Sequence, residues 1–400
     1  MILSERQRTI SALGIVEIFA WGSTFYLMAV LAGPMSADFG WSPGAITSGI
    51  SLGLLVSGLA ASRVGRIIQA RGGRQVLVAG MVMISAGLTV LGLAESFPVY
   101  LFAWALLGLG MSASLYDAAF STLGRHYGSG ARSAITVLTL WGGFASTVCW
   151  PISAFLVEAV GWRMACFAYA LLHLTVTLPL CWFALPRGVS TATGQDHSAN
   201  GGSRDIIGRF DLRFWCIALA GTVLAVLSSI WSIHLITILT AEGYALAAAV
   251  GLGTLIGPAQ VGARILEMMG RGRHHAIWTM IASTALSLVG FIGLYFQLPA
   301  AAALVAYGAG NGLWSIARGS LPLSLFGPRD YPRIMGRLAT PMLIAAAAAP
   351  MLGAFLIEGY GARGTLLVLA LGATIPCLAA LVLSLDLLKE RKDLRKAGAV

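Results

Sequence analysis

Four ionisable side chains lie inside long apolar stretches of the sequence: Glu17, Asp117, His234 and Arg318. A charged side chain at the centre of a membrane span costs roughly 2.5–3.5 kcal/mol on insertion scales, so such residues usually have a specific task. The guanidinium of Arg318 is permanently charged, and its fork of donors suits a carboxylate or another oxyanion. The carboxyl groups of Asp117 and Glu17 can bind a coupling proton, because burial favours the neutral form. His234 can act as a proton site or as part of a gate.

Each of these residues also has a structural interpretation. Asp117 and Arg318, 201 positions apart, can pair and hold two parts of the protein together. Glu17 can tie its helix to a neighbouring helix, and His234 can be a packed polar residue. The sequence leaves these alternatives open. For His173 we expect a structural role.

The composition identifies lipid as the main solvent of this chain. Of the 400 residues, 58% are hydrophobic and only 10% are charged, and 49 are glycine. The mean hydropathy is +0.83. No soluble fold of this size has enough interior for so many apolar side chains. This excludes a cytosolic enzyme, a secreted disulfide scaffold and a disordered regulator. The five cysteines form no CxxC pair and are expected to be buried apolar residues.

Apolar runs long enough to cross a bilayer recur along the whole chain. A helix needs about 20 residues to cross roughly 30 Å of hydrocarbon, and it satisfies its own backbone groups in lipid. The sequence therefore predicts an all-α membrane protein with twelve transmembrane helices, at about residues 10–32, 43–62, 75–94, 97–123, 132–156, 163–185, 213–240, 243–263, 275–296, 299–325, 334–356 and 363–387. We number these spans 1 to 12.

A polar stretch rich in Gly and Ser divides the spans into two groups of six. The predicted organisation is an N-terminal six-helix half (1–185), a cytoplasmic linker (186–211), a C-terminal six-helix half (212–388) and a basic cytoplasmic tail (389–400). The halves resemble each other at an offset near 200 residues, because residues 154–163 (AFLVEAVGWR) match residues 354–363 (AFLIEGYGAR).

The basic residues indicate how the spans face. With the N-terminus inside, 23 of the 26 Lys and Arg residues fall on cytoplasmic loops and tails; Arg163 and Arg363 lie outside and Arg318 lies within a span. This positive-inside asymmetry predicts that both termini are cytoplasmic in a bacterial inner membrane. The first apolar run is expected to be a retained span rather than a signal peptide. The net charge of +10 is thus a topology signal, and nucleic-acid binding is not expected.

Two similar six-helix halves with a basic loop between spans 2 and 3 resemble the major facilitator superfamily of secondary transporters. The loop GRIIQARGGR at 65–74 looks like the superfamily signature G-x-L-x-D-R-x-G-R-R. It departs at Gln69, where an aspartate is usual, and at Ala70, where a basic residue is usual. The resemblance implies a gating loop formed by Gly65, Arg66, Gln69, Gly72 and Arg74.

The departures from the superfamily pattern have consequences for the expected mechanism. Gln69 can still accept a hydrogen bond, and Arg264 with Glu267 occupies the pseudo-equivalent place in the second half. Trp104 stands where proton-coupled drug antiporters often carry an arginine, which argues against a typical multidrug antiporter. The segments 255–264 and 310–319 resemble a bacterial branch that is loosely similar to the monocarboxylate and oxalate/formate porters.

The resemblance also implies where the four ionisable residues lie, because spans 1, 4, 7 and 10 line the central cavity of the superfamily. Glu17, Asp117 and Arg318 are each about seven residues from the inner end of their span, so they are expected at one depth, roughly 10 Å from the inner edge. Further candidate substrate-binding residues share their helix faces: Asn311, Trp314 and Ser315 with Arg318, and Trp21 and Thr24 with Glu17.

Other motifs give no support for an enzyme or a metal site. The GxSxG match at 49–53 lies within a helical span, where no nucleophile elbow can form. His274 and His275 lie in a basic loop without nearby acids or cysteines, which argues against a metal. We expect no catalytic residues, no metal and no cofactor.

These observations predict a secondary active transporter, not an enzyme. The expected cargo is a small organic anion of the carboxylate type, held by Arg318, with proton coupling through Asp117 or Glu17. The alternative is efflux of a toxic compound, either a drug or a metalloid. A membrane-embedded enzyme or a sensor is the rival from another class. The expected partners are a small-molecule substrate, protons and the lipid bilayer, and the expected state is a monomer.

Overall fold

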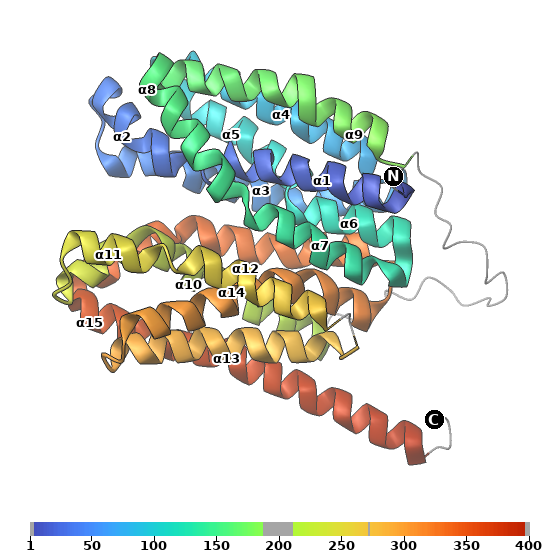
Figure 1. The fold of residues 1–400 in the computed structure, drawn as a ribbon. Helices are drawn as coiled ribbons and strands as arrows, with labels where there is room; N and C mark the ends of the chain where they lie inside the picture. Colours follow the sequence, from blue (N-terminus) through green and yellow to red (C-terminus); the bar gives the residue numbers. More distant parts are fainter. Residues whose placement is uncertain (1–3, 187–210, 271–272, 397–400) are drawn as a thin grey trace. The chain divides into compact units, whose positions relative to one another are not determined.

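The computed structural model of the chain describes residues 4–186, 211–270 and 273–396. These residues form helices and no strand (Figure 1), so the predicted all-α membrane fold is confirmed. Seven helical stretches are long and apolar enough to cross a membrane. Two of them, Phe97–Ala184 (88 residues) and Tyr331–Glu390 (60 residues), are too long for a single crossing. The described helices together make up a twelve-helix membrane fold.

The helices follow the predicted spans closely at most of their ends. The first six spans contain α1 (Glu5–Gly22), α2 (Met28–Phe39), α3 (Pro43–Arg71), α4 (Gly73–Gly92), α5 (Phe97–Ser114), α6 (Tyr116–Tyr127), α7 (Ala131–Gly143), α8 (Ala145–Leu172), the π-helix η2 (His173–Thr177) and α9 (Leu178–Ala184), with a 3₁₀ turn η1 (Gly128–Gly130) before α7. The last six contain α10 (Leu212–Ala241), α11 (Leu246–Gly253), α12 (Ile256–Met269), α13 (Ala276–Tyr295), α14 (Ala300–Phe326) and α15 (Tyr331–Lys396).

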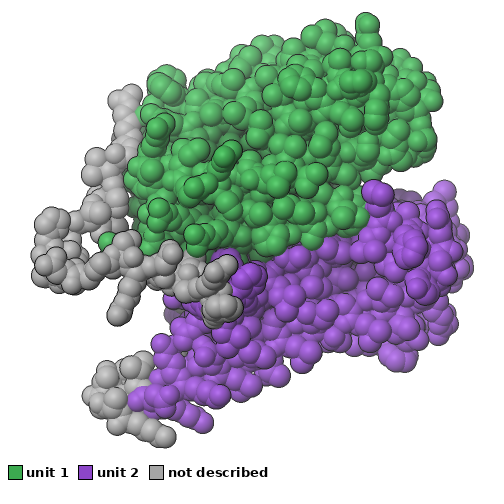
Figure 2. Space-filling view, turned by 180° about the vertical axis from the view of Figure 1, so that it is seen from behind, with its two compact units in different colours: residues 1–193, 326–350 green, residues 194–325, 351–400 purple. Residues whose placement is uncertain are grey.

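The chain forms two compact units, coloured separately in Figure 2. Unit 1 comprises residues 1–193 and 326–350, and unit 2 comprises residues 194–325 and 351–400. The beginning of α15 thus belongs to unit 1, although it follows unit 2 residues in the sequence. The division into halves at the linker stays a prediction, because residues 187–210 lie outside the described chain.

Span 1 is interrupted in its middle, which the sequence did not predict. Helix α1 ends at Gly22, and α2 begins only at Met28. The Thr24 hydroxyl donates to the Ala20 carbonyl over 2.5 Å, and the Ser23 hydroxyl bonds to His173. Hydroxyls that bond a carbonyl one turn earlier compete with the helix ladder and bend helices. The break is therefore built from side-chain hydroxyls rather than from a proline.

Span 4 has a similar interruption between α5 and α6. Leu115 adopts an extended backbone (φ −77°, ψ −176°) and separates the two helices. The preceding Ser114 donates its hydroxyl to the Gly110 carbonyl over 2.6 Å, as Thr24 does in span 1. Asp117 consequently lies in the first turn of α6 instead of in the middle of a span. The N-terminus of a helix favours negative charge.

The equivalent spans of unit 2 are continuous. Helix α10, which is span 7, runs for 30 residues, and α14, which is span 10, runs for 27. Span 8 of unit 2 is interrupted, because it consists of two shorter helices, α11 and α12.

The sequence repeat appears as a repeated turn. Gly161 and Gly361 both have positive φ angles, +82° and +68°, within the matched segments 154–163 and 354–363. Only glycine adopts this conformation readily. Each glycine reverses the chain between consecutive spans, so α8 contains parts of spans 5 and 6, and α15 contains spans 11 and 12.

A cluster at one corner of unit 1 joins α2 to α8, and we call Asp38, Phe39, Trp162 and Arg163 the corner cluster. Arg163 Nη2 lies 2.8 Å from Asp38 Oδ2, and Trp162 Nε1 donates to the same oxygen over 3.2 Å. Arg163 also donates to the backbone carbonyl of Ala94 over 2.6 Å and lies against the rings of Trp162 and Phe39. The outer half of span 1 is thereby fixed at its far end.

Candidate functional site

Glu17 is the most deeply buried carboxyl group of the described chain. It lies on α1 with 0% of its surface exposed, and neither carboxyl oxygen has a hydrogen-bond partner among the described residues. The indole of Trp21, one turn away, interacts with this carboxyl group without reaching full hydrogen-bond geometry. An ionised carboxylate in such a place costs much free energy, so the neutral acid is favoured.

Asp117 is the acidic neighbour of Glu17. The two residues repel each other when both are ionised, so the structure brings these two predicted site residues together within unit 1. They differ in surroundings, because Asp117 is half-buried at the start of α6 whereas Glu17 is inside the unit. Only one of the two is in a position that favours a charge.

A cluster of aromatic side chains includes Trp21, which interacts with Glu17, and Tyr116, which precedes Asp117 in the sequence. The ring of Trp21 lies 5.2 Å from that of Tyr116 and 5.6 Å from that of Phe25, measured between centroids. Tyr116 in turn stacks on Phe120 at 5.0 Å. Sequence reasoning missed Tyr116, although its position beside Asp117 was a usable signal. Thr24, a predicted substrate ligand, is fully buried and already uses its hydroxyl proton on Ala20.

The predicted anion-binding residues lie on one face of α14 in unit 2. Asn311, Trp314, Ser315 and Arg318 are spaced by three or four residues, which puts them on neighbouring turns. The side-chain oxygen Oδ1 of Asn311 accepts a hydrogen bond from the Ser228 hydroxyl on α10 over 3.3 Å. The Ser315 hydroxyl bonds to the Gly312 carbonyl over 2.7 Å.

Ser228 is a further polar residue that sequence reasoning missed. It lies on α10, the helix that also carries His234. The signal was weak, because serines are common in apolar helices, where they bond to their own backbone. His234 is half-buried and packs on Gly353, where an added Cβ would lie 2.5 Å from its ring. The predicted pairing of Asp117 with Arg318 stays a prediction.

The gating loop of unit 1 packs closely on the beginning of α15. The side-chain amide of Gln69 donates to the backbone carbonyl of Arg329 over 2.6 Å. The expectation that Gln69 accepts a hydrogen bond is thus corrected: it acts as the donor. An added Cβ on Gly65 would lie 2.3 Å from the carbonyl oxygen of Pro332, so glycine is required for this approach. Arg66 is exposed.

The remaining loop residues have structural explanations of their own. Gly72 has a φ of +89° and separates α3 from α4, which explains the glycine. Arg74 lies over the ring of Trp182, 4.6 Å from its centroid. A second contact with α15 joins the hydroxyls of Ser62 and Thr340 over 2.9 Å. The contacts that join this region to the beginning of α15 are therefore neutral hydrogen bonds and close backbone packing.

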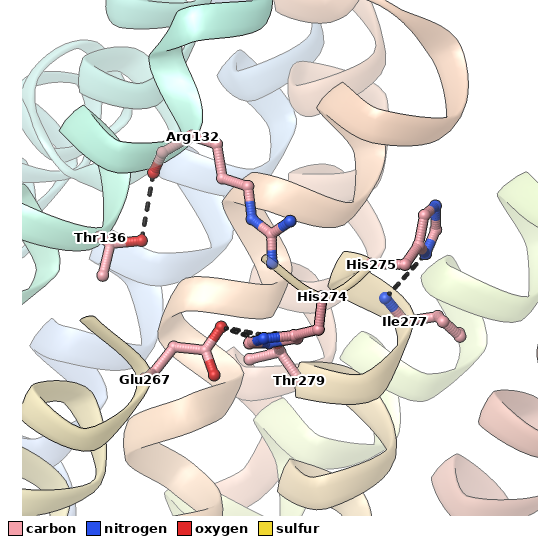
Figure 3. Close-up of polar contacts among 7 residues, drawn as sticks. All are labelled: Arg132, Thr136, Glu267, His274, His275, Ile277 and Thr279. Carbon is pink, nitrogen blue, oxygen red and sulfur yellow. Dashed lines mark hydrogen bonds and ion pairs between the residues drawn. The ribbon is translucent and has the colours of Figure 1, made fainter. Parts of the chain in front are cut away.

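The pseudo-equivalent loop of unit 2 uses charged residues instead. Arg264 is 5% exposed and donates to the Gly312 carbonyl on α14 over 3.3 Å. The Glu267 carboxylate accepts from the Thr279 hydroxyl at 2.8 Å and lies 3.0 Å from His274 Nε2 (Figure 3). The expectation that His274 has no acid nearby was therefore wrong, because seven residues of α12 and its loop bring Glu267 back to it. No group of metal-ligating residues occurs among the described residues.

Comparisons with known proteins agree with this architecture. The family model of the Major Facilitator Superfamily matches residues 13–277, which is more than half of the chain. No curated protein matches the sequence.

Several solved structures share the fold. The proton:xylose symporter XylE, bound to 6-bromo-6-deoxy-D-glucose, is 12% identical with a TM-score of 0.74, covering 94% of each chain. The human organic anion transporter MFSD10 (TETRAN) is 14% identical with a TM-score of 0.75, covering 94% of this chain and 100% of that one. The transporter FucP in its outward conformation is 12% identical with a TM-score of 0.74, covering 95% and 99%.

At these identities the structural likeness establishes the fold, and the family model establishes the kinship. Both agree with the all-helical membrane fold. The chain belongs to the major facilitator superfamily, and is accordingly a multi-pass secondary transporter rather than an enzyme.

Proposed function

We propose that this protein transports a small organic anion of the carboxylate type and couples its movement to protons by alternating access. The observation that carries the proposal is that the candidate proton-binding acids and the candidate anion-binding arginine lie in different units. Unit 1 holds the buried acid Glu17 beside Asp117, and unit 2 holds Arg318 on a face with Asn311 and Ser315.

The acids of unit 1 provide the proton site. Glu17 is buried without a hydrogen bond among the described residues, and it lies close enough to Asp117 for the two charges to repel. Such a pair holds one proton more readily than none, because two ionised carboxylates would destabilise each other. Release of that proton leaves a negative charge that must be balanced elsewhere in the transport cycle.

The polar face of α14 provides the anion site. Arg318 contributes a permanent positive charge and several donors in a plane, which match a carboxylate better than a lysine would. Asn311 and Ser228 add amide and hydroxyl groups within reach of each other. A solved structure with the same fold is described as an organic anion transporter, which agrees with this cargo class.

A second candidate function is efflux of a toxic apolar compound. The aromatic residues Trp21, Tyr116 and Phe120 near the acids favour it, since flat apolar molecules stack on such rings. We further propose that the protein is a monomer of the bacterial inner membrane with both termini in the cytoplasm.

The test is flux into proteoliposomes driven by an imposed pH gradient. We expect accumulation of one or more labelled monocarboxylates or dicarboxylates, and collapse of that accumulation when a protonophore removes the gradient. Extrusion of drugs or metalloids in place of acids would support the second candidate. Absence of flux for acids, drugs and metalloids in oriented vesicles would overturn both and favour a sensor.

A further inference from the structure

A buried chain of hydrogen bonds joins the break in span 1 to span 6. The Ser23 hydroxyl, at the end of α1, lies 2.7 Å from His173 Nε2. His173 Nδ1 lies 2.9 Å from the Thr177 hydroxyl. That hydroxyl lies 3.0 Å from the sulfur of Met81 on α4 and 3.1 Å from the backbone carbonyl of His173. Ser23, His173 and Thr177 are each 0% exposed.

The direction of each bond follows from the donors and acceptors present. The hydroxyl proton of Thr177 points to the His173 carbonyl or to the Met81 sulfur, since both are acceptors. Thr177 therefore accepts from His173 Nδ1–H, which assigns the proton to Nδ1. His173 Nε2 is then an acceptor, and the Ser23 hydroxyl donates to it. A neutral ring satisfies all partners, as a buried histidine requires.

Two local distortions meet at this histidine. Residues His173–Thr177 form a π-helix, and Ser23 begins the five-residue interruption between α1 and α2. A π-helix is rare, and it occurs frequently at functional sites. Helix α1, which carries Glu17 and Trp21, is therefore fixed to span 6 at the residue where it ends.

We propose that His173 is the positioning residue of a hinge in span 1, an inference that rests on the proposed transport function. The ring holds Ser23 and so keeps the end of α1, with Glu17, in place on span 6. Residues 24–27 are the part of span 1 that bends next to this fixed point, between α1 and α2. His173 itself neither binds cargo nor carries the coupling proton.

The experiment compares three single variants of the full-length protein in detergent and in proteoliposomes. His173→Leu removes both ring nitrogens at similar volume, and His173→Gln restores one acceptor for Ser23 and one donor for Thr177. Thr175→Val is the matched control, because Thr175 lies in the same π-helix but is exposed and bonds to Leu171 of its own helix.

Hydrogen–deuterium exchange is the first measurement and requires no cargo. In His173→Leu we expect the amides of residues 23–30 to exchange about tenfold faster, because the buried Ser23 hydroxyl loses its partner. His173→Gln should restore most of the protection, and Thr175→Val should not differ from wild type. Unchanged exchange at residues 23–30 in well-folded His173→Leu would overturn the proposal, whether or not any transport is found.

Transport kinetics is the second measurement. We expect His173→Leu to lower turnover about tenfold with little change in KM, and Ser23→Ala combined with His173→Leu to be no slower than His173→Leu alone. Additive losses, or an effect on KM only, would contradict a shared positioning role. If wild type transports none of the tested acids, the proposed function fails while the exchange measurement still decides on the hinge.

Discussion

The two units carry related sequences but treat their equivalent spans differently. Spans 1 and 4 of unit 1 are broken at residues 23–27 and at Leu115, whereas spans 7 and 10 of unit 2 run unbroken as α10 and α14. The acids lie on the broken helices, and Arg318 lies on a continuous one. The two units thus share one architecture, and hydroxyl side chains such as Thr24 and Ser114 bond to the backbone next to the breaks of unit 1.

The turns at the matched segments 154–163 and 354–363 also differ between the units. Arg163 pairs with Asp38, bonds a backbone carbonyl and lies against two rings, whereas its counterpart Arg363 lies over the single ring of Tyr295 at 5.7 Å. Unit 1 therefore combines internal breaks with a firmly held corner. We therefore expect any bending of span 1 to occur at the break between α1 and α2.

The largest effect is expected from the charge on α14. Arg318→Ala should lower carboxylate transport by at least about thirtyfold, because removing one partner of a buried charged contact costs about 2–5 kcal/mol. Labelled uptake into proteoliposomes measures this. Arg363→Ala is the matched control in the same unit and should transport normally. Near-normal uptake by Arg318→Ala would remove the anion-binding role.

The acids of unit 1 should affect coupling rather than exchange. Glu17→Gln keeps the shape of the side chain but cannot release a proton, so gradient-driven accumulation should be lost while exchange of labelled for unlabelled cargo continues. Asp117→Asn should lower both the gradient-driven accumulation and the exchange of cargo. Asp117 is less buried than Glu17, so its charge is expected to matter in both processes. Proton and cargo flux measured together test this. If Glu17→Gln still accumulates cargo against a gradient, Glu17 is structural.

The gating loops of the two units can be compared by exchanging the residue types at one pair of equivalent positions. Gly65 of unit 1 corresponds to Ala263 of unit 2, at the residue before Arg66 and Arg264. Gly65→Ala should lower turnover about tenfold, since its Cβ must displace the Pro332 carbonyl at a cost of about 1–3 kcal/mol. Stopped-flow or initial-rate uptake measures it, and Ala263→Gly is the control. Equal rates for both would contradict a gate in unit 1.

The corner cluster should contribute to stability more than its counterpart does. Arg163→Ala should lower the free energy of unfolding by about 1–2 kcal/mol, a modest value because both charged side chains are partly exposed. Arg363→Ala should change it by less than about 0.5 kcal/mol. Thermal unfolding in one detergent compares the two. A larger loss of unfolding free energy in Arg363→Ala than in Arg163→Ala would contradict the greater stability contribution of the corner cluster.

The smallest effect concerns His126 near the end of α6. Burial lowers the pKa of His126 below its usual value, and Glu5 on α1 partly offsets this. A lowered pKa means that the neutral ring is preferred in the folded protein, so this stability is present above the pKa of the unfolded chain and is lost as pH falls. His126→Gln should flatten the decrease in melting temperature between about pH 7 and pH 5. An unchanged slope would mean that other groups dominate.

Hydropathy was sufficient to predict the span positions, because the cost of polar groups in lipid acts on every residue of a span. The helix breaks were not predictable in the same way. Ser23 and Leu115 are ordinary residues in membrane helices, and the hydrogen-bond partner of Ser23, His173, lies 150 residues later in the chain. No proline stands at either break, and Gly22, directly before Ser23, gives no specific signal because the chain contains 49 glycines.

Some of the site residues could be predicted from the sequence, and others could not. Glu17 and Asp117 were recognised because charge in an apolar run is rare, and the structure brings them together. Ser228 and Tyr116 were missed because a serine or a tyrosine in a span costs little and so attracts no attention. A hydrogen bond of Gln69 was predicted, but its direction was not, because an amide offers both a donor and an acceptor.

The broken first span has a consequence for how the protein is made. Helix α2 has 12 residues, or about 18 Å, and cannot cross the hydrocarbon alone, so α1 and α2 must enter the membrane as one continuous segment. His173 is synthesised 150 residues after Ser23, a delay of about 8–30 s at normal elongation rates. The hydrogen bond between Ser23 and His173 can therefore form only after span 6 has been synthesised.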